Sequence, residues 1–84
     1  MSDKNTEIYE VIKEHLVGRG IDAGQITMEA DLAKNVGLDS LDVTELTLAL
    51  EEHFSVEIPD EELEGLVTVK DAVDLVAAKA AVGA

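Results

Sequence analysis

The strongest candidate for chemistry in this chain is the hydroxyl of Ser40, which lies within the run Gly37 to Asp42 (GLDSLD). The run stands at the head of an acidic amphipathic segment that ends at Phe54, so Ser40 is expected where a loop becomes a helix. The first turn of a helix has unpaired backbone N–H groups and about half a positive charge, and it therefore favours an anionic group such as a phosphodiester. A modifiable serine there indicates a carrier and not a catalyst.

Hydrophobic residues recur at three- to four-residue spacing in four stretches, which predicts an all-α fold. The expected architecture is a small four-helix bundle: three main helices plus a short third helix, with a long loop (19–39) between the first two. No stretch alternates for long enough to predict a strand. The helices are expected at about 3–17, 40–54, 60–66 and 68–80, and the loop is expected to be pinned to the core by Ile26, Leu32, Val36 and Leu38.

Residues that can cap a helix stand at the start of three of these segments. Asp39 is the expected N-cap of the second helix, because its carboxylate can accept hydrogen bonds from the first-turn N–H groups. Pro59 suits the start of the third helix, with Asp60 as its cap. Thr68 with Asp71 resembles a capping box for the fourth helix. The expected core stripe of that fourth helix is Val69, Ala72, Val73 and Val76.

Size and composition restrict what the chain can be. Its 84 residues predict one domain over 1–84, with a core too small to enclose a deep active site. It has no cysteine, no run of the roughly 18 apolar residues that span a membrane, and none of the basic and apolar start of a signal peptide. We therefore expect a cytoplasmic monomer without membrane insertion.

The net charge of -13 comes from 19 acidic and 6 basic residues. Such a charge disfavours nucleic acid and anionic membrane surfaces as partners and favours basic protein surfaces. The stretch between Lys34 and Lys70 contains no Lys or Arg, so its acids are expected to be uncompensated. The ten acids of this stretch are Asp39, Asp42, Glu45, Glu51, Glu52, Glu57, Asp60, Glu61, Glu62 and Glu64.

The second helix has two apolar stripes when its residues are placed at about 100° intervals. One stripe is continuous and is the predicted core face. The opposite stripe alternates leucine with glutamate, which a plain solvent-facing surface does not need. We interpret it as a docking stripe, with leucines as anchors and acids that steer a basic partner. The core face is Val43, Leu46, Leu50 and Phe54, and the docking stripe is Leu41, Glu45, Leu48 and Glu52.

Neither a metal centre nor a catalytic triad is expected. His15 and His53 lie on different predicted helices without a third ligand, whereas zinc sites need three or four. The acids of 57–64 lack the spacing of an EF-hand loop and are expected to bind divalent ions at most weakly. A serine hydrolase would need a nucleophile elbow and an oxyanion loop, which the sequence lacks.

From Asp31 to about Val76 the chain resembles the acyl carrier protein family. The resemblance implies a carrier that is not itself an enzyme, with Ser40, flanked by Asp39 and Leu41, as the attachment point of 4′-phosphopantetheine. A separate phosphopantetheinyl transferase would move this group from coenzyme A, and its thiol would carry acyl chains as thioesters. The motifs that carry the resemblance are 36–42 (VGLDSLD), 44–46 (TEL), 48–54 (LALEEHF), 57–62 (EIPDEE) and 68–73 (TVKDAV).

The same resemblance implies where partner enzymes dock. Acyl synthases, reductases and transferases, together with the phosphopantetheinyl transferase, would meet the carrier through basic patches, most typically in fatty acid biosynthesis. Such contacts should be brief and weakened by salt, since each enzyme must release the carrier. The implied docking residues are Asp39, Leu41, Glu45, Leu48, Glu51, Glu52, Ile58 and Asp60.

Alternatives to the fatty acid pathway stay open. Many family members have Asp-Leu before the glycine, where this chain has Asn35-Val36, and Lys34 replaces an often acidic or neutral position. These departures fit a specialised carrier of a polyketide or other lipid pathway, and an aminoacyl carrier would share the fold and the serine. The alternative of a different class is an unmodified acidic protein-interaction module, for which Ser40 has no role.

Overall fold

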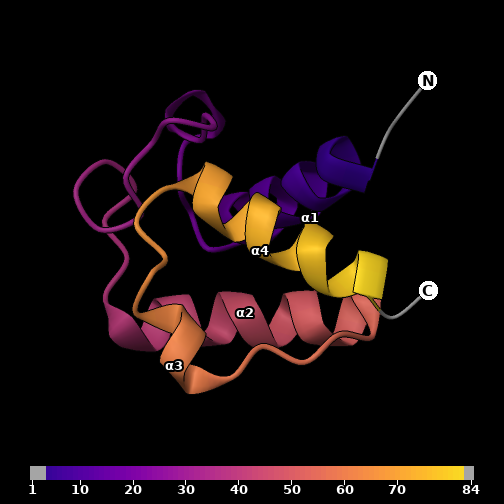
Figure 1. Cartoon of the computed structure of the whole chain (residues 1–84). Helices are drawn as coiled ribbons and strands as arrows, with labels where there is room; N and C mark the ends of the chain where they lie inside the picture. Colours follow the sequence, from indigo (N-terminus) through magenta and orange to yellow (C-terminus); the bar gives the residue numbers. More distant parts are fainter. Residues whose placement is uncertain (1–3, 83–84) are drawn as a thin grey trace.

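The computed structural model describes residues 4–82 and confirms the predicted all-α fold (Figure 1). The main helices are α1 (Lys4–Gly18), α2 (Ser40–Phe54) and α4 (Val69–Val82), and the short α3 (Asp60–Leu63) lies beside α2. The long loop contains a 3-10 helix, η1 (Ala23–Gln25). The expected first residue of the first helix, Asp3, lies outside the described residues. No helix within 4–82 is long and apolar enough to cross a bilayer.

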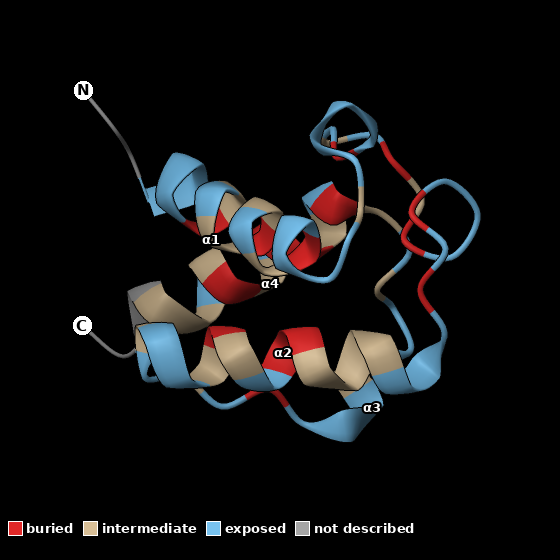
Figure 2. Cartoon of the chain, turned by 180° about the vertical axis from the view of Figure 1, so that it is seen from behind, coloured by how far each residue is buried: buried red, intermediate tan, exposed pale blue. Residues whose placement is uncertain are grey.

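The core lies where α1, α2 and α4 pack together, and Figure 2 shows buried segments on all three helices. The predicted core stripe of α4 is fully buried. On α2 the prediction holds in part, because Leu46 and Leu50 are buried whereas Val43 and Phe54 are only half-buried. Thr47 is buried as well, which its polarity did not predict. Its hydroxyl donates to the Thr44 carbonyl at 2.8 Å, so the buried polar group has a partner.

The long loop is held by its own apolar side chains and by pairing with the segment before α4. All four residues predicted to pin it are buried. Asp31 forms an isolated antiparallel bridge with Thr68, and the Leu32 N–H donates to the Val67 carbonyl at 2.8 Å. The Asp31 carboxylate also accepts from two backbone N–H groups of the following turn. The loop is therefore a packed part of the fold and delivers the chain to the start of α2.

A Schellman motif ends α1 and makes Arg19 its C-cap. The Gly20 N–H donates to the Val17 carbonyl and the Ile21 N–H to the Leu16 carbonyl, each at 3.0 Å. These bonds satisfy carbonyls that the last helical turn leaves open. Gly20 adopts φ +97°, a left-handed conformation that glycine reaches without a Cβ clash. The motif fixes where the Arg19 backbone lies relative to the helices.

The third helix differs from its prediction at both ends. It stops at Leu63 instead of 66, because the N–H groups of Gly65 and Leu66 turn back to carbonyls only three residues away. The prediction that Asp60 caps the helix was wrong. Pro59 is the N-cap and supplies no side-chain acceptor, so Asp60 is the exposed first residue of the helix.

The capping box predicted for α4 is confirmed. The Asp71 N–H donates to Thr68 Oγ1 at 3.2 Å, and the Thr68 N–H donates back to Asp71 Oδ2 at 3.1 Å. The Val67 N–H donates to the same carboxylate oxygen at 3.1 Å. The hydrogen bond from the Thr68 backbone is the main reason why the pKa of Asp71 lies below its ordinary value, and burial opposes it only in part.

A lowered carboxyl pKa makes this cap sensitive to acid. Its contribution to the free energy of unfolding is present above the ordinary aspartate pKa of about 3.9 and is lost as the pH falls through the lower folded-state value. We expect Asp71→Ala to cost about 1 kcal/mol at pH 7 and progressively less as the pH falls toward 2, as measured by urea unfolding. Asp74→Ala, which removes an exposed carboxylate paired with Lys70 at 3.2 Å, is the control. A cost for Asp71→Ala that does not shrink with acidification would contradict this account.

Candidate functional site

A reciprocal capping box begins α2 and positions Ser40. Asp39 is the N-cap as predicted: its carboxylate accepts from the Asp42 N–H at 2.9 Å, and the Asp42 carboxylate accepts from the Asp39 N–H at 3.3 Å. The hydrogen bond from the Asp39 N–H to the Asp42 carboxylate was not predicted, because the third position of a helix with a capping box usually holds Glu or Gln. Gly37, at φ +85°, turns the loop into the helix just before Asp39. Ser40 is therefore the first residue of a helix whose start is fixed from both sides.

Ser40 is exposed, and its hydroxyl makes no hydrogen bond within residues 4–82; only its carbonyl is engaged, by the Thr44 hydroxyl at 2.9 Å. The backbone N–H groups of Ser40 and Leu41 also lack a partner in this range, as expected for the first turn of a helix. The site thus offers a free hydroxyl next to two free N–H donors.

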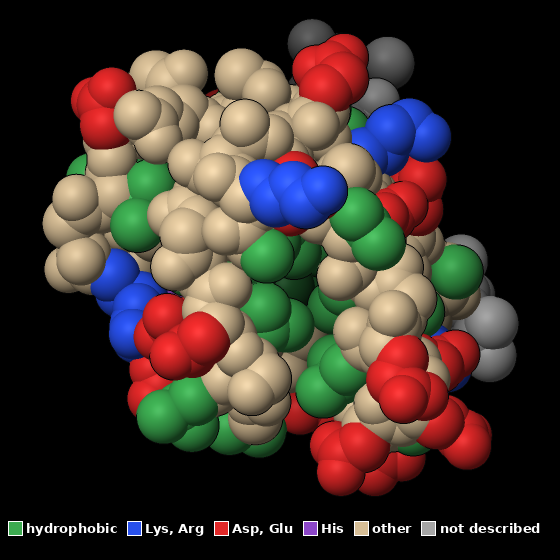
Figure 3. Space-filling view, turned by 90° about the vertical axis from the view of Figure 1, so that its left-hand side faces the viewer, with side chains coloured by type: hydrophobic (Ala, Val, Ile, Leu, Met, Phe, Trp, Pro, Cys, Tyr) green, Lys and Arg blue, Asp and Glu red, His purple; other side chains and the backbone are tan. Residues whose placement is uncertain are grey.

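A shallow pocket of about 320 Å³ opens beside Ser40, where the long loop meets α2 and α3. Most of its lining is apolar, and Figure 3 shows hydrophobic side chains around a hollow on this face, with acidic side chains nearby. An apolar pocket next to this serine suits the apolar part of any group that would be attached there. The lining residues are Ala33, Leu38, Asp39, Ser40, Val43, Thr44, Leu63, Glu64 and Leu66.

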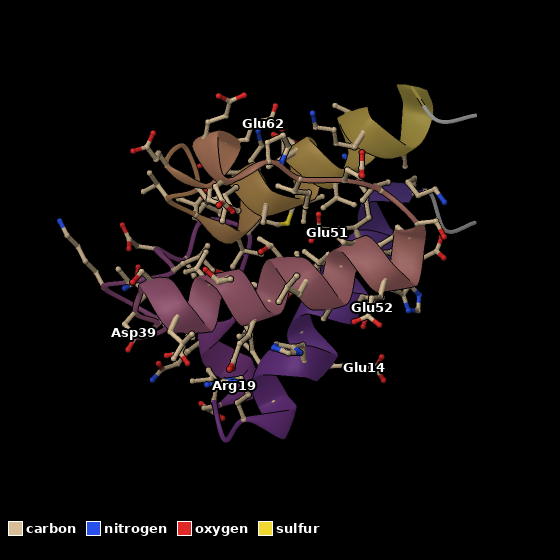
Figure 4. The ribbon with its side chains drawn as sticks, turned by 90° about the horizontal axis from the view of Figure 1, so that it is seen from below. Glu14, Arg19, Asp39, Glu51, Glu52 and Glu62 are labelled. Carbon is tan, nitrogen blue, oxygen red and sulfur yellow. The ribbon has the colours of Figure 1, made fainter. Side chains whose placement is uncertain are left out.

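The docking stripe lies on the surface of α2. Leu41 and Leu48 are 65% and 51% exposed, which places them among the most exposed large apolar residues of the described chain. Glu52 is exposed as well, whereas Glu45 is half-buried. Figure 4 shows Asp39 at one end of α2 and Glu52 toward the other, so the stripe spans the helix from the site outward.

Arg19 compensates part of the acidic stretch, so the expectation that all ten acids are uncompensated was wrong. Its guanidinium binds the carboxylates of both Asp42 and Glu45, across the contact between α1 and α2 (Figure 4). Lys79 of α4 pairs in the same way with Glu62, at 2.7 Å. Both cations come from outside the stretch between Lys34 and Lys70, which is why the local count of charges missed them.

Ile58 and Glu51, two of the implied docking residues, are engaged within the fold, as Asp39 and Glu45 are. Ile58 is buried with only 7% of its surface exposed, so in this conformation its side chain belongs to the core and cannot meet a partner. Glu51 is half-buried, and its carboxylate accepts from the Ile58 N–H at 2.7 Å, on the edge of α2 that faces the α2–α3 connection (Figure 4). Glu51 therefore braces that connection. The implied docking residues that are exposed are Asp39, Leu41, Leu48, Glu52 and Asp60.

The residues considered for metal binding do not come together. Among residues 4–82 no group of three or more His, Asp or Glu side chains is arranged to hold a metal ion. His15 lies near the end of α1, and His53 packs its ring edge-on against Phe54 with ring centroids 4.7 Å apart.

Comparisons with known proteins agree with this geometry. A protein-family profile described as the phosphopantetheine attachment site matches residues 10–76. The chain is 52% identical over 67 residues to the acyl carrier protein of Helicobacter acinonychis (strain Sheeba) and 54% identical over 67 residues to that of Helicobacter pylori (strain G27). Each match covers 80% of this chain and 82% of the relative. The chain belongs to the acyl carrier protein family.

The fold agrees with this assignment. A solved structure of acyl carrier protein from Enterococcus faecalis superposes with a TM-score of 0.76 at 29% identity, and covers 92% of this chain and 99% of its own. Acyl carrier proteins are carriers and not catalysts. The family match also implies a phosphopantetheine prosthetic group, and the free hydroxyl and N–H donors of Ser40 suit its phosphate.

The left-handed turn at Gly37 is expected to be essential for the geometry of the site. Gly37→Ala should cost about 1 kcal/mol in the free energy of unfolding, because alanine disfavours φ +85° even though no atom lies within 4 Å of the new Cβ. Gly18→Ala is the matched control: it also meets no atom within 4 Å, but lies in α1 without a positive φ, so no loss is expected. Urea unfolding of both variants measures the difference, and equal stabilities would refute it.

Proposed function

We propose that this acyl carrier protein holds 4′-phosphopantetheine as a phosphodiester on Ser40 and carries acyl groups as thioesters on the terminal thiol. The observation that best supports this site is the exposure of an unengaged serine hydroxyl at the first position of a capped helix. The prosthetic group supplies the reactive thiol, and the protein supplies position and recognition.

The electrostatics at Ser40 favour an attached phosphodiester. The free N–H groups of Ser40 and Leu41 and the positive end of the α2 dipole attract its charge. The carboxylates of Asp39 and Asp42 would repel it, but both already have partners. Asp39 accepts from the Asp42 N–H, and Asp42 is bound by Arg19. The site can therefore hold a negative group despite the acidity of the chain.

A separate phosphopantetheinyl transferase would perform the attachment and would supply the base for the Ser40 hydroxyl. The Ser40 oxygen would bond to the phosphorus that bears pantetheine as the P–O bond of the coenzyme A pyrophosphate breaks. Adenosine 3′,5′-bisphosphate would leave, and the Ser40 proton would pass to the transferase. Partner enzymes would then recognise the exposed acids and leucines through basic patches. Fast association without tight binding suits a carrier that must move between enzymes.

Fatty acid biosynthesis is the pathway we favour, and the pocket beside Ser40 supports a lipid cargo because its lining is mostly apolar. A specialised lipid or polyketide carrier uses the same features, and the residues Lys34, Asn35 and Val36 leave that alternative open. An unmodified acidic interaction module, by contrast, predicts that Ser40 never carries a group. We expect the carrier to act as a monomer in the cytoplasm.

Intact mass spectrometry before and after incubation with coenzyme A and a broad-specificity phosphopantetheinyl transferase tests the proposed attachment. The wild-type chain should gain the mass of one phosphopantetheine, or carry it already when purified. Ser40→Ala should never carry it. Ser2→Ala is a control at a second serine and should load fully. A wild-type chain that never gains this mass, or a Ser40→Ala chain that does, would overturn the proposal.

Leu48 is expected to be an anchor for partner enzymes. Leu48→Ala should lower kcat/KM for loading by about three- to tenfold. The exposed leucine would be buried only in the complex, so its burial would stabilise the complex and not the free carrier. Circular dichroism should stay unchanged, since little of the core is lost. Val17→Ala, which removes a 44% exposed valine on α1, is the control and should load normally. If the two variants load at the same rate, Leu48 is not an anchor.

A further inference from the structure

The only arginine of the chain lies on the face that is expected to attract cations. Arg19 binds Asp42 and Glu45, which occupy the first two turns of α2 directly after Ser40. Its side chain is 36% exposed, and the side chains of Asp42 and Glu45 are 23% and 44% exposed. A cation supplied by the carrier itself thus occupies the first two acids of α2 after Ser40.

Arg19 is held in this place by the fold. Its backbone is the C-cap of α1, fixed by the hydrogen bonds of Gly20 and Ile21 and by the left-handed turn at Gly20. Since α1 packs against α2, the guanidinium has a short distance to cover, and its planar fork can bind two carboxylates at once. An intramolecular cation placed in this way competes with any cation that arrives from outside.

The acids of α2 therefore differ in availability. Glu52 and Asp39 are exposed and make no ion pair within residues 4–82, whereas Asp42 and Glu45 are already paired. The half-exposed pair at Glu45 is open enough for an incoming lysine or arginine to replace Arg19. Such a replacement exchanges one exposed ion pair for another. It therefore contributes less to the free energy of binding than a new ion pair with an unpaired acid does.

We propose that Arg19 is a built-in competitor for basic partner surfaces, and that it weakens docking at the turns of α2 nearest to Ser40. This inference rests on the proposed loading of Ser40. It predicts that partners hold the carrier chiefly through the unpaired acids and the exposed leucines, and that a partner which needs Glu45 must first displace Arg19. The Arg19 ion pairs thereby keep the contact between carrier and partner brief at the first turns of α2, next to the serine whose prosthetic arm must leave the partner.

The test is the loading rate of charge-matched variants at low ionic strength. Arg19→Ala frees Asp42 and Glu45, so its KM for loading by the transferase should fall roughly two- to fivefold below that of the control, with kcat little changed. The control is Lys13→Ala, which makes the same change in net charge on α1 but removes a lysine that has no ion pair within residues 4–82. The difference between the two variants should vanish in high salt.

Arg19→Gln guards against a folding defect, because it removes the charge and keeps most of the side chain. Its melting temperature and circular dichroism should match the wild type closely, since exposed ion pairs contribute little to stability. An equal KM for Arg19→Ala, Arg19→Gln and Lys13→Ala, or a higher KM for the Arg19 variants, would overturn the proposal. A wild-type chain that is not loaded at all would instead refute the proposed function, so the two failures are distinguishable.

Discussion

The hydrogen bonds at the start of α2 are the constraint on which the rest of this site depends. A helix that begins at Ser40 needs acceptors for its first N–H groups, and the Asp39 and Asp42 carboxylates supply a reciprocal pair. The left-handed turn at Gly37 brings the chain into that arrangement. Because the cap uses the N–H of Asp42, the N–H groups of Ser40 and Leu41 stay free for an attached anion. One local motif thus fixes the helix, exposes the hydroxyl and leaves two N–H donors free for the proposed phosphate.

Two other parts of the fold hold this motif in place: the loop before α2 and Arg19 at the end of α1. The loop before α2 buries four apolar residues and pairs with the segment before α4, so the chain arrives at Gly37 from a packed position. On the far side, Arg19 joins the end of α1 to the capping residue Asp42. Asp42 therefore takes part in both the helix cap and the contact between helices. Such a double role for one residue suits a small domain, which buries only about 60–65% of its unfolded surface.

Much of this arrangement could be predicted from the sequence because it is encoded locally. The start of α2, its N-cap Asp39, the Thr68–Asp71 box and the core stripe of α4 all follow from residues a few positions apart. Features that depend on distant residues could not be predicted in this way. Arg19 meets Glu45 across 26 positions, and Ile58 joins the core cluster despite its acidic neighbours. The third helix was predicted too long because its apolar spacing continued past the point where the backbone turns.

Amide hydrogen exchange of the unmodified chain tests most directly whether the start of α2 is preformed. The Asp42 N–H donates to Asp39 Oδ1 and the Val43 N–H to the Asp39 carbonyl at 3.0 Å, both before any group is attached. We expect both N–H groups to exchange far more slowly than those of Ser40 and Leu41, and to keep that protection after loading. Exchange at the rate of an unfolded peptide until phosphopantetheine is attached would contradict a preformed site.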